Sequence, residues 1–421
     1  MIHQLGHKLR EQIHRFSGKL CLGFGKVTSR FVEEMLYGIQ ARGSLRLSEV
    51  ARALDEKITL KKAVDRLSRN LDAPGLSESI SASVLHEGAP RVGHDTLLIV
   101  DPSDLRKKYG RKMEHLARIR DGSEKEIGWG YWLNIIVGAE INGSEIVPLV
   151  HELYSSKAPD FISENHQILE ASRRLREATE DRGIFVLDRG GDRGKLYEEY
   201  VGTDSYRFII RQRGDRDVLY RGRKRRMMAL ARSCPLPYRE TVVKEKDGRE
   251  AVYCLRFGCV PVRLPAHPKK KLWLVVVQGF GQTPLMLLTT EPMRRSKKVV
   301  WRIVAAYITR WRVEETIRFI KRSYDLEDIR VLTYRRLKNM AALVLAAAFF
   351  AAVHLGLKVK MEVLAMHVME AAKRLFGIPN FRYYALADGI KEILNRTGRG
   401  VVGKRKDPDN LPESQIPLFI T

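Results

Sequence analysis

Four polar residues are spaced along one uninterrupted segment so that a helix would bring them to a single face. The segment Trp301–Tyr324 contains no Gly or Pro, and it carries Tyr307, Arg310, Glu314 and Lys321 at positions i, i+3, i+7 and i+14. Residues three and four apart are neighbours on a helix surface. A carboxylate can bind a hard metal ion, and Arg and Lys can bind phosphate. The pattern indicates a face able to hold a metal-bound phosphodiester, and a solvated face held by ion pairs is the alternative.

Two further acidic residues follow short apolar runs that are typical of buried strands. The run Thr96–Val100 ends on Asp101, and the run Gly183–Leu187 ends on Asp188. Strand ends of a helix-flanked sheet meet in one crevice, so these carboxylates could converge with Glu314. Three such carboxylates can hold two Mg²⁺ ions about 4 Å apart. Oxygen ligands suit Mg²⁺, or Mn²⁺ as its substitute, better than zinc.

Each of these carboxylates has an acidic neighbour that is an alternative ligand. The neighbours are Asp104, Asp192 and Glu315. Placement at the predicted strand ends favours Asp101 and Asp188 over Asp104 and Asp192. Helical phase favours Glu314, because Glu315 is turned by about 100° from the face of Arg310.

The elements that must position these residues form an α/β pattern. Between 91 and 214 we expect strands at 96–100, 129–141, 145–154, 183–187 and 206–214, and helices at 163–179 and 193–200. The stretch 105–122 is basic and is expected to be a helix or a loop. Asn142-Gly143 is a strong hairpin signal between two of the strands. The order predicts a mixed sheet flanked by helices.

The rest of the chain divides around this core. We expect a helical DNA-binding region at 1–90, the first part of the core at 91–214, an all-β insertion at 215–290, the second part of the core with the long helix at 291–377, and a partly mobile extension at 378–421. Helices opening on Ser44 and Thr59 suit a helix-turn-helix, although any small helical bundle would have this pattern. In the insertion, aromatic residues such as Trp273 lie among cations and could stack on bases, or could form sheet core.

The charge of the chain indicates its partner. Lys and Arg number 75 against 50 Asp and Glu, which gives +25. Such a field attracts polyanions, so nucleic acid is expected and an anionic membrane surface is the alternative. Met340–Leu357 carries no formal charge and approaches the length of a membrane-spanning helix. Its high Ala content favours a buried core helix, so no membrane is expected.

Four cysteines are too few for a disulfide framework, which predicts a cytoplasmic protein. Cys254 and Cys259 could bind zinc, but we expect them to be ordinary strand residues. Near the C-terminus, Gly398, Gly403 and Lys404 have the spacing of a phosphate loop. Arg405 stands at its Ser/Thr position and no strand precedes it, so no ATP dependence is expected.

The run Tyr307-x2-Arg310-x3-Glu314-x6-Lys321 resembles the Tyr–Arg–Glu–Lys signature of insertion-sequence transposases of the IS-four type. The segments LLIVDPSDL and FVLDRGGDRG resemble the two Asp motifs of these DDE enzymes. The resemblance covers roughly residues 30 to 350. It implies a ribonuclease-H-like catalytic core carrying a β-strand insertion.

The resemblance also implies roles. Asp101, Asp188 and Glu314 would bind two Mg²⁺ ions, and Tyr307, Arg310 and Lys321 would hold the phosphates of the transposon end. Well-studied relatives cut one strand, form and reopen a DNA hairpin, and join the 3′ ends to target DNA. They act as homodimers on paired inverted repeats, in the prokaryotic cytoplasm at the nucleoid.

Two features depart from the family. Where some relatives stack a flipped base on a Trp, this chain has Leu285, and Trp273 on the neighbouring strand is the substitute. Little chain remains after Gly377 for a long C-terminal dimerisation domain. The sequence therefore predicts a cut-and-paste DNA transposase. The alternatives are another ribonuclease-H-like nuclease, a catalytically retired DNA-binding protein and a membrane-surface protein.

Overall fold

The computed structural model describes residues 2–108, 110, 112–120, 126–143, 145–203, 206–246, 249–294, 296–324, 326–371 and 382–401. Within these ranges the side chains at 244–250, 312–323, 328, 367–371 and 382–385 are not described. The chain forms two compact units. One comprises Met1–Val84, Tyr109–Glu114 and Phe319–Thr421, and the other comprises Leu85–Lys108 and His115–Arg318.

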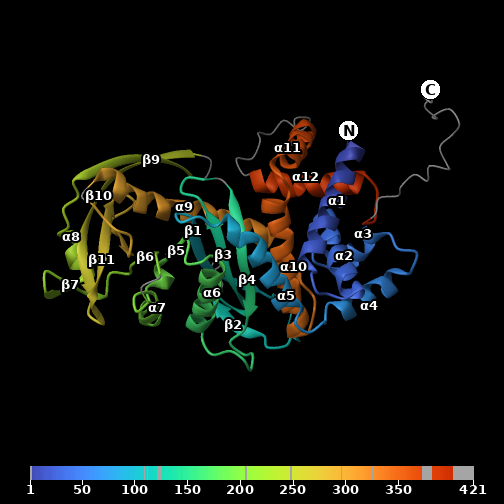
Figure 1. The fold of residues 1–421 in the computed structure, drawn as a ribbon, viewed down its shortest axis with the longest axis horizontal. Helices are drawn as coiled ribbons and strands as arrows, with labels where there is room; N and C mark the ends of the chain where they lie inside the picture. The colour runs from blue at the N-terminus through green and yellow to red at the C-terminus, as the bar shows by residue number, and fades with distance from the viewer. Residues whose placement is uncertain are drawn as a thin grey trace. The chain divides into compact units, whose positions relative to one another are not determined.

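A mixed sheet of twelve described strands runs through the second unit (Figure 1). The strands are β1 (Leu97–Arg106), β2 (Ala117–Arg120), β3 (Ile127–Ala139), β4 (Ile146–Tyr154), β5 (Ile184–Leu187), β6 (Phe208–Arg211), β7 (Asp217–Tyr220), β8 (Arg223–Arg226), β9 (Tyr238–Lys246), β10 (Arg249–Leu264), β11 (His267–Gln278) and β12 (Leu285–Thr289). Their order is β2-β3-β1-β5-β6-β12-β11-β10-β7-β8, with β4 beside β3 and β9 beside β10. The predicted mixed α/β fold is confirmed.

The sheet combines a parallel centre with antiparallel flanks. β1, β5 and β6 are parallel neighbours, whereas β3 pairs antiparallel with both β1 and β4. The predicted hairpin between β3 and β4 is present, and Asn142 in its turn adopts a positive φ of 61°. The strands predicted at 215–290 continue the same sheet, because β12 pairs with β6. They enclose one short helix, α8 (Met227–Arg232), which the all-β prediction omitted.

The prediction that the first strand ends at Asp101 is wrong. β1 continues to Arg106, so the predicted helix or loop at 105–122 begins as strand and includes β2. The cause is long-range pairing, since β3 lies opposite β1 from Leu97 to Arg106. Beyond Val100 the other side of β1 has no paired residue of β5. Pro102, which has no backbone N–H to donate, is tolerated at such an edge.

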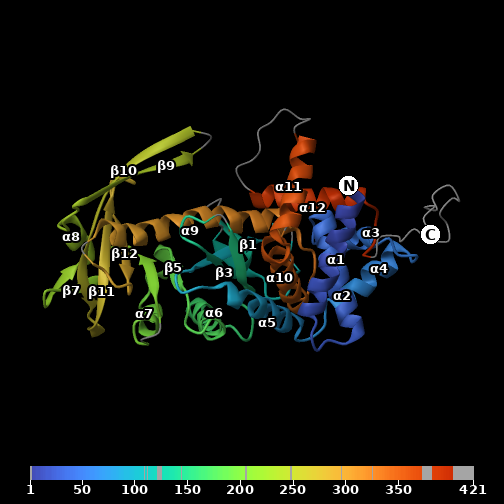
Figure 2. The same cartoon turned by 45° about the horizontal axis from the view of Figure 1, so that its top comes forward.

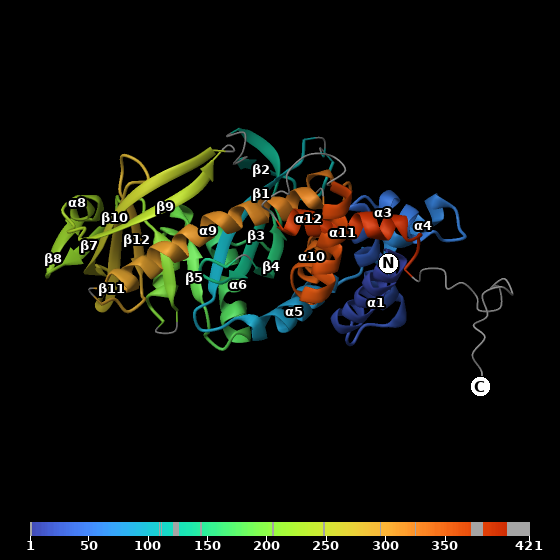
Figure 3. The same ribbon diagram turned by 90° about the horizontal axis from the view of Figure 1, so that it is seen from above.

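One face of this sheet carries a hydrophobic core of buried side chains. Helix α6 (Glu164–Ala178), capped by Ser163, contributes Ile168 and Leu175, and helix α7 (Gly194–Tyr200) contributes Leu196 and Tyr197. Helix α9 (Lys297–Ser323) lies on the other face (Figure 2). It crosses the strands from β12 to β1 (Figure 3). The Thr309 hydroxyl of α9 accepts a hydrogen bond of 3.1 Å from the backbone N–H of Asn142.

The first unit is helical. Its helices are α1 (Ile2–Leu20), α2 (Lys26–Arg42), α3 (Leu47–Leu54), α4 (Leu60–Asn70), most of α5 (Leu76–Gly88), α10 (Tyr334–Phe349), α11 (Leu357–Ala371) and α12 (Arg382–Arg396). Gly43 ends α2 with a φ of 59°. Thr59 caps α4, as the sequence predicted. The predicted Ser44 cap is wrong, because α3 begins at Leu47 with Arg46 at the capping position.

The apolar segment forms a core helix of this unit. The stretch Tyr334–His354 is long and apolar enough to cross a membrane, but 83% of its most apolar window is buried inside the protein. Gln40 of α2 donates a 2.8 Å hydrogen bond to the carbonyl of Ala347, and Phe349 stacks on Phe16 of α1. These contacts are typical of a core helix, as the sequence predicted.

Candidate active site

The register of β1 and β5 brings Asp101 and Asp188 to the same level of the sheet. The two strands are parallel and their last pair is Val100 with Leu187, so each carboxylate belongs to the next residue. Val100 and Leu187 both lie in the core that contains α6 and α7. Since side chains alternate along an extended chain, Asp101 and Asp188 point to the opposite face. Neighbouring strands lie about 4.8 Å apart, so two acidic side chains are adjacent there.

Arg310 of α9 reaches Asp188 on this face. Its Nη2 atom lies 3.8 Å from Oδ2 of Asp188, and the Arg310 side chain is only 3% exposed whereas that of Asp188 is 47% exposed. The other carboxylate oxygen accepts a 2.6 Å hydrogen bond from the backbone N–H of Gly190. A buried guanidinium therefore stands beside a carboxylate that a ligand can reach.

Tyr307 lies one turn before Arg310 and is fully buried. Its ring packs edge-on against Trp311, with centroids 5.5 Å apart, and the Arg310 guanidinium lies 5.7 Å from its centre. Burial raises the pKa of the Tyr307 phenol, although the nearby cations Arg310 and Arg211 oppose this rise. The phenol therefore remains protonated, and its ring packs against the Arg310 guanidinium.

Aromatic contacts fix α9 on the strands of the insertion. Trp301 packs against Phe257 of β10 with centroids 5.4 Å apart, and Trp311 packs edge-on against Phe280 at 5.0 Å. Aromatic pairs of this kind each contribute about 0.5–1.5 kcal/mol beyond the area they bury. The insertion thus positions the helix that carries Arg310.

The remaining two predicted residues of the helical face belong to α9, but their side chains lie outside the described ones. Glu314 follows Arg310 by four residues and Lys321 follows it by eleven. Helical periodicity keeps Glu314 on the face of Arg310. The assignment of both residues to the site stays a prediction.

The chemistry of the donors fits a hard divalent cation. Asp101 is half-buried and Asp188 is half-exposed, and carboxylate oxygens are the ligands that Mg²⁺ prefers. Among the described side chains, no group of three His, Cys, Asp or Glu residues is placed to hold a metal ion. Glu314, whose side chain is not among the described ones, stays the predicted third ligand.

The contacts separate two candidates from their acidic neighbours. Asp192 is buried, and its carboxylate holds Arg216 at 2.8 Å and accepts a 2.9 Å hydrogen bond from the backbone N–H of Arg213. Asp104 is three residues from Asp101 on the same strand, so it points to the opposite face. These positions favour Asp188 and Asp101 as the ligands.

Trp273 lies on β11, directly opposite Thr289 of β12. It is half-buried, and the Lys271 ammonium lies 4.6 Å from the centre of its ring. Leu285 on β12 is buried, so it offers no surface for a base. Cys254 and Cys259 both lie on β10, as predicted for strand residues.

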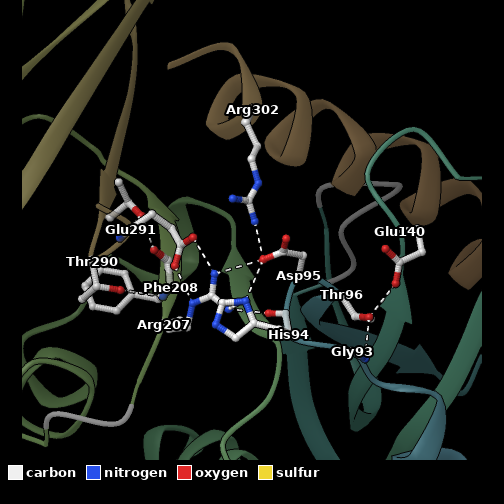
Figure 4. A network of polar contacts seen from close by, with 11 residues as sticks. Gly93, His94, Asp95, Thr96, Glu140, Arg207, Phe208, Thr290, Glu291 and Arg302 are labelled. Carbon is white, nitrogen blue, oxygen red and sulfur yellow. Dashed lines mark hydrogen bonds and ion pairs between the residues drawn. The ribbon is translucent and has the colours of Figure 1, made fainter. Parts of the chain in front are cut away.

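A charged network that the sequence did not reveal joins the strands to α9 (Figure 4). Arg207, just before β6, binds both carboxylate oxygens of Glu291 at 2.7 Å, and Glu291 follows β12. Asp95, which precedes β1, forms ion pairs with Arg207 at 3.3 Å and with Arg302 of α9 at 2.5 Å. His94 contacts Arg207 in the same cluster. Burial opposes ionisation of Asp95, but its hydrogen bonds with His94, Arg302 and Arg207 outweigh burial and lower the pKa of its carboxyl. These partners are far apart in sequence, so no spacing pattern could have found them.

The region of the chain that contains this site matches a known protein family. Residues 94–350, more than half of the chain, match the protein family described as "Transposase DDE domain". No curated protein sequence matches the chain. Among solved structures, the chain is similar to a piggyBac transposase in a synaptic complex with hairpin DNA, with 10% sequence identity and a TM-score of 0.46 over 98% of this chain and 82% of that one.

Proposed function

Because the chain belongs to the DDE transposase family, we propose that it is a cut-and-paste DNA transposase of the IS-four type with a ribonuclease-H-like core. It would cleave DNA at the ends of its transposon and join those ends to target DNA. The main support for the proposal is the position of Asp101 and Asp188, which lie at the same level on one face of β1 and β5. Arg310 of α9 reaches Asp188 on that face.

Asp101, Asp188 and Glu314 would hold two Mg²⁺ ions, with Mn²⁺ as a substitute. Bound there, the ions would supply an activated water or 3′-hydroxyl and neutralise charge on the leaving oxygen. The protein's own part is positioning. Gly190 orients the Asp188 carboxylate, and the strand register keeps Asp101 beside it.

Phosphate binding would belong to α9. Arg310 presents a planar guanidinium that matches phosphate oxygens, and its burial against Tyr307 restricts its rotamers. Lys321 would bind a second phosphate along the same helix. Trp273, with Lys271 over its ring, is our candidate for stacking on a flipped base if the reaction passes through a DNA hairpin.

The remaining assignments extend this proposal. The helical region 1–90, with the pair α3 and α4, would bind the terminal inverted repeats. The insertion 215–290 and the segments 91–214 and 291–377 would form the catalytic part, and 378–421 an extension. We propose a homodimer on paired ends, acting in the prokaryotic cytoplasm at the nucleoid.

Cleavage of the element's own end DNA tests the function. Wild-type protein should nick the end with Mg²⁺ and bind it without nicking in Ca²⁺. Glu314→Gln should bind the same DNA with unchanged affinity and fail to nick it in Mg²⁺, because a neutral amide is a poor ligand for a hard cation. Tight binding without cleavage in Mg²⁺ or Mn²⁺ would instead identify a retired DNA-binding protein.

DNA affinity should fall steeply with salt. Each phosphate that Lys or Arg neutralises releases condensed counterions, so the logarithm of the affinity should fall linearly with the logarithm of salt concentration, with a slope near −0.9 per contact. The excess of cations, +25 in net charge, predicts several such contacts. Fluorescence anisotropy between about 50 and 200 mM salt should show a loss of roughly a thousandfold for about six contacts. An affinity independent of salt would contradict the electrostatic part of the proposal.

A further inference from the structure

Two large apolar side chains are exposed at one end of β3. Trp129 is 52% exposed and Ile127 is 67% exposed. The neighbouring strand β2 places Arg118 directly opposite Trp129 and Arg120 directly opposite Ile127, and both Arg residues are exposed. Directly opposed residues lie on the same face of a sheet. The hairpin thus presents an indole and an isoleucine side chain beside two guanidinium groups.

Packing on the reverse face explains why Trp129 points outward. Gly128 and Gly130 flank it, and Cβ atoms at these positions would lie 3.1 Å from Arg106 Nε and 2.6 Å from Ile119 Cδ1, respectively. Arg106 and Ile119 therefore cover the reverse face at these two glycines. The same reverse face holds the ion pair of Arg106 with Glu126, at 3.4 Å.

Trp129 lies on the same face of the sheet as Asp101, and the β3 side chains between their levels, Tyr131 and Leu133, are buried. Asp101 lies directly opposite Ile135 of β3, and Trp129 precedes Ile135 by six residues. An even spacing keeps both on one face of the sheet. At about 3.3 Å per residue, Trp129 stands roughly 20 Å along the strand from the level of Asp101.

We propose that Trp129, with Arg118 and Arg120, binds an unpaired DNA base and the phosphates beside it. The inference rests on the proposed function, since it takes DNA as the substrate. An exposed indole offers a flat surface on which any base can stack, and neighbouring guanidinium groups bind the backbone. Ile127 extends the apolar surface, and the two cations distinguish it from a surface for a neutral protein partner.

Binding of two DNA probes by the full-length protein tests this site. One probe is a fluorescein-labelled blunt duplex of about 30 base pairs, and the other is the same duplex with a short single-stranded thymidine overhang. Trp129→Ala should weaken binding of the overhang probe by roughly five- to a hundredfold. It should leave binding of the blunt duplex within about twofold, because Arg and Lys elsewhere hold the duplex backbone.

Two variants serve as controls. Trp129→Phe retains an aromatic ring and should keep most of the affinity for the overhang. Ile162→Ala removes an apolar side chain that is 69% exposed in the same unit, and it should change neither affinity. Because Trp129 and Ile162 are both exposed, the thermal unfolding temperature of all three variants should match that of the wild type, which excludes misfolding as the cause.

Photo-crosslinking gives a second readout. An overhang containing 5-iodo-deoxyuridine should crosslink to the peptide that contains Trp129. Unchanged overhang binding by Trp129→Ala, or crosslinks only to other peptides, would overturn this inference while leaving the transposase proposal intact. A change in oligomeric state without a change in DNA affinity would also overturn it. If the wild type binds neither probe, the proposed function itself fails.

Discussion

Asp188→Asn is expected to abolish nicking of the transposon end while leaving DNA binding intact. The substitution preserves shape and the hydrogen bond from Gly190, but it removes the charge that would attract a divalent cation. A metal ion stabilises the charge that develops in the transition state by several kcal/mol, so the loss in rate should be roughly a thousandfold or more. Single-turnover cleavage in Mg²⁺ and anisotropy in Ca²⁺ measure the two effects separately.

The acidic neighbours make matched controls for this substitution. Asp104→Asn changes a residue on the opposite face of β1 and should retain nicking within a few-fold. Asp192→Asn should weaken the contacts to Arg216 and the backbone of Arg213, and should lower the free energy of unfolding by about 1–3 kcal/mol. If Asp192→Asn were stable but inactive and Asp188→Asn active, our choice of ligand would be wrong.

Local patterns predicted the elements that local interactions determine. The apolar run before Asp188 forms β5, the helix expected from residue 163 is α6 with Ser163 as its cap, and Thr59 caps α4. In each case neighbouring residues supply the stabilising interaction, so a short window of sequence contains the information.

Long-range pairing accounts for what the sequence could not predict. The apolar run at 96–100 suggested a strand that ends at Asp101, but β3 pairs with β1 as far as Arg106. Trp129 was expected within a strand, yet its exposure depends on β2 and on the glycines beside it. The approach of Arg310 to Asp188 depends on how α9 lies across the sheet, which helical spacing alone does not determine.

Arg207→Met is expected to be among the most destabilising single substitutions in the second unit. Glu291 is 3% exposed and binds Arg207 through both oxygens, so the variant leaves a buried carboxylate without its cation. Breaking a buried ion pair by removing one partner costs about 3–5 kcal/mol. Denaturant unfolding followed by fluorescence should show a lower midpoint and a free energy of unfolding reduced by about 3–5 kcal/mol.

Arg173→Met is the matched control for burial. Arg173 binds both oxygens of Glu199 at 2.9 and 2.7 Å, which is nearly the geometry of Arg207 with Glu291. Its side chain, however, is 44% exposed, so water screens the pair and its loss should cost less than about 1 kcal/mol. Equal losses in the two variants would contradict burial as the cause. A large loss confined to Arg207→Met would show that the junction of β6, β12 and α9 depends on this buried pair, because Arg207 also contacts Asp95, the partner of Arg302 on α9.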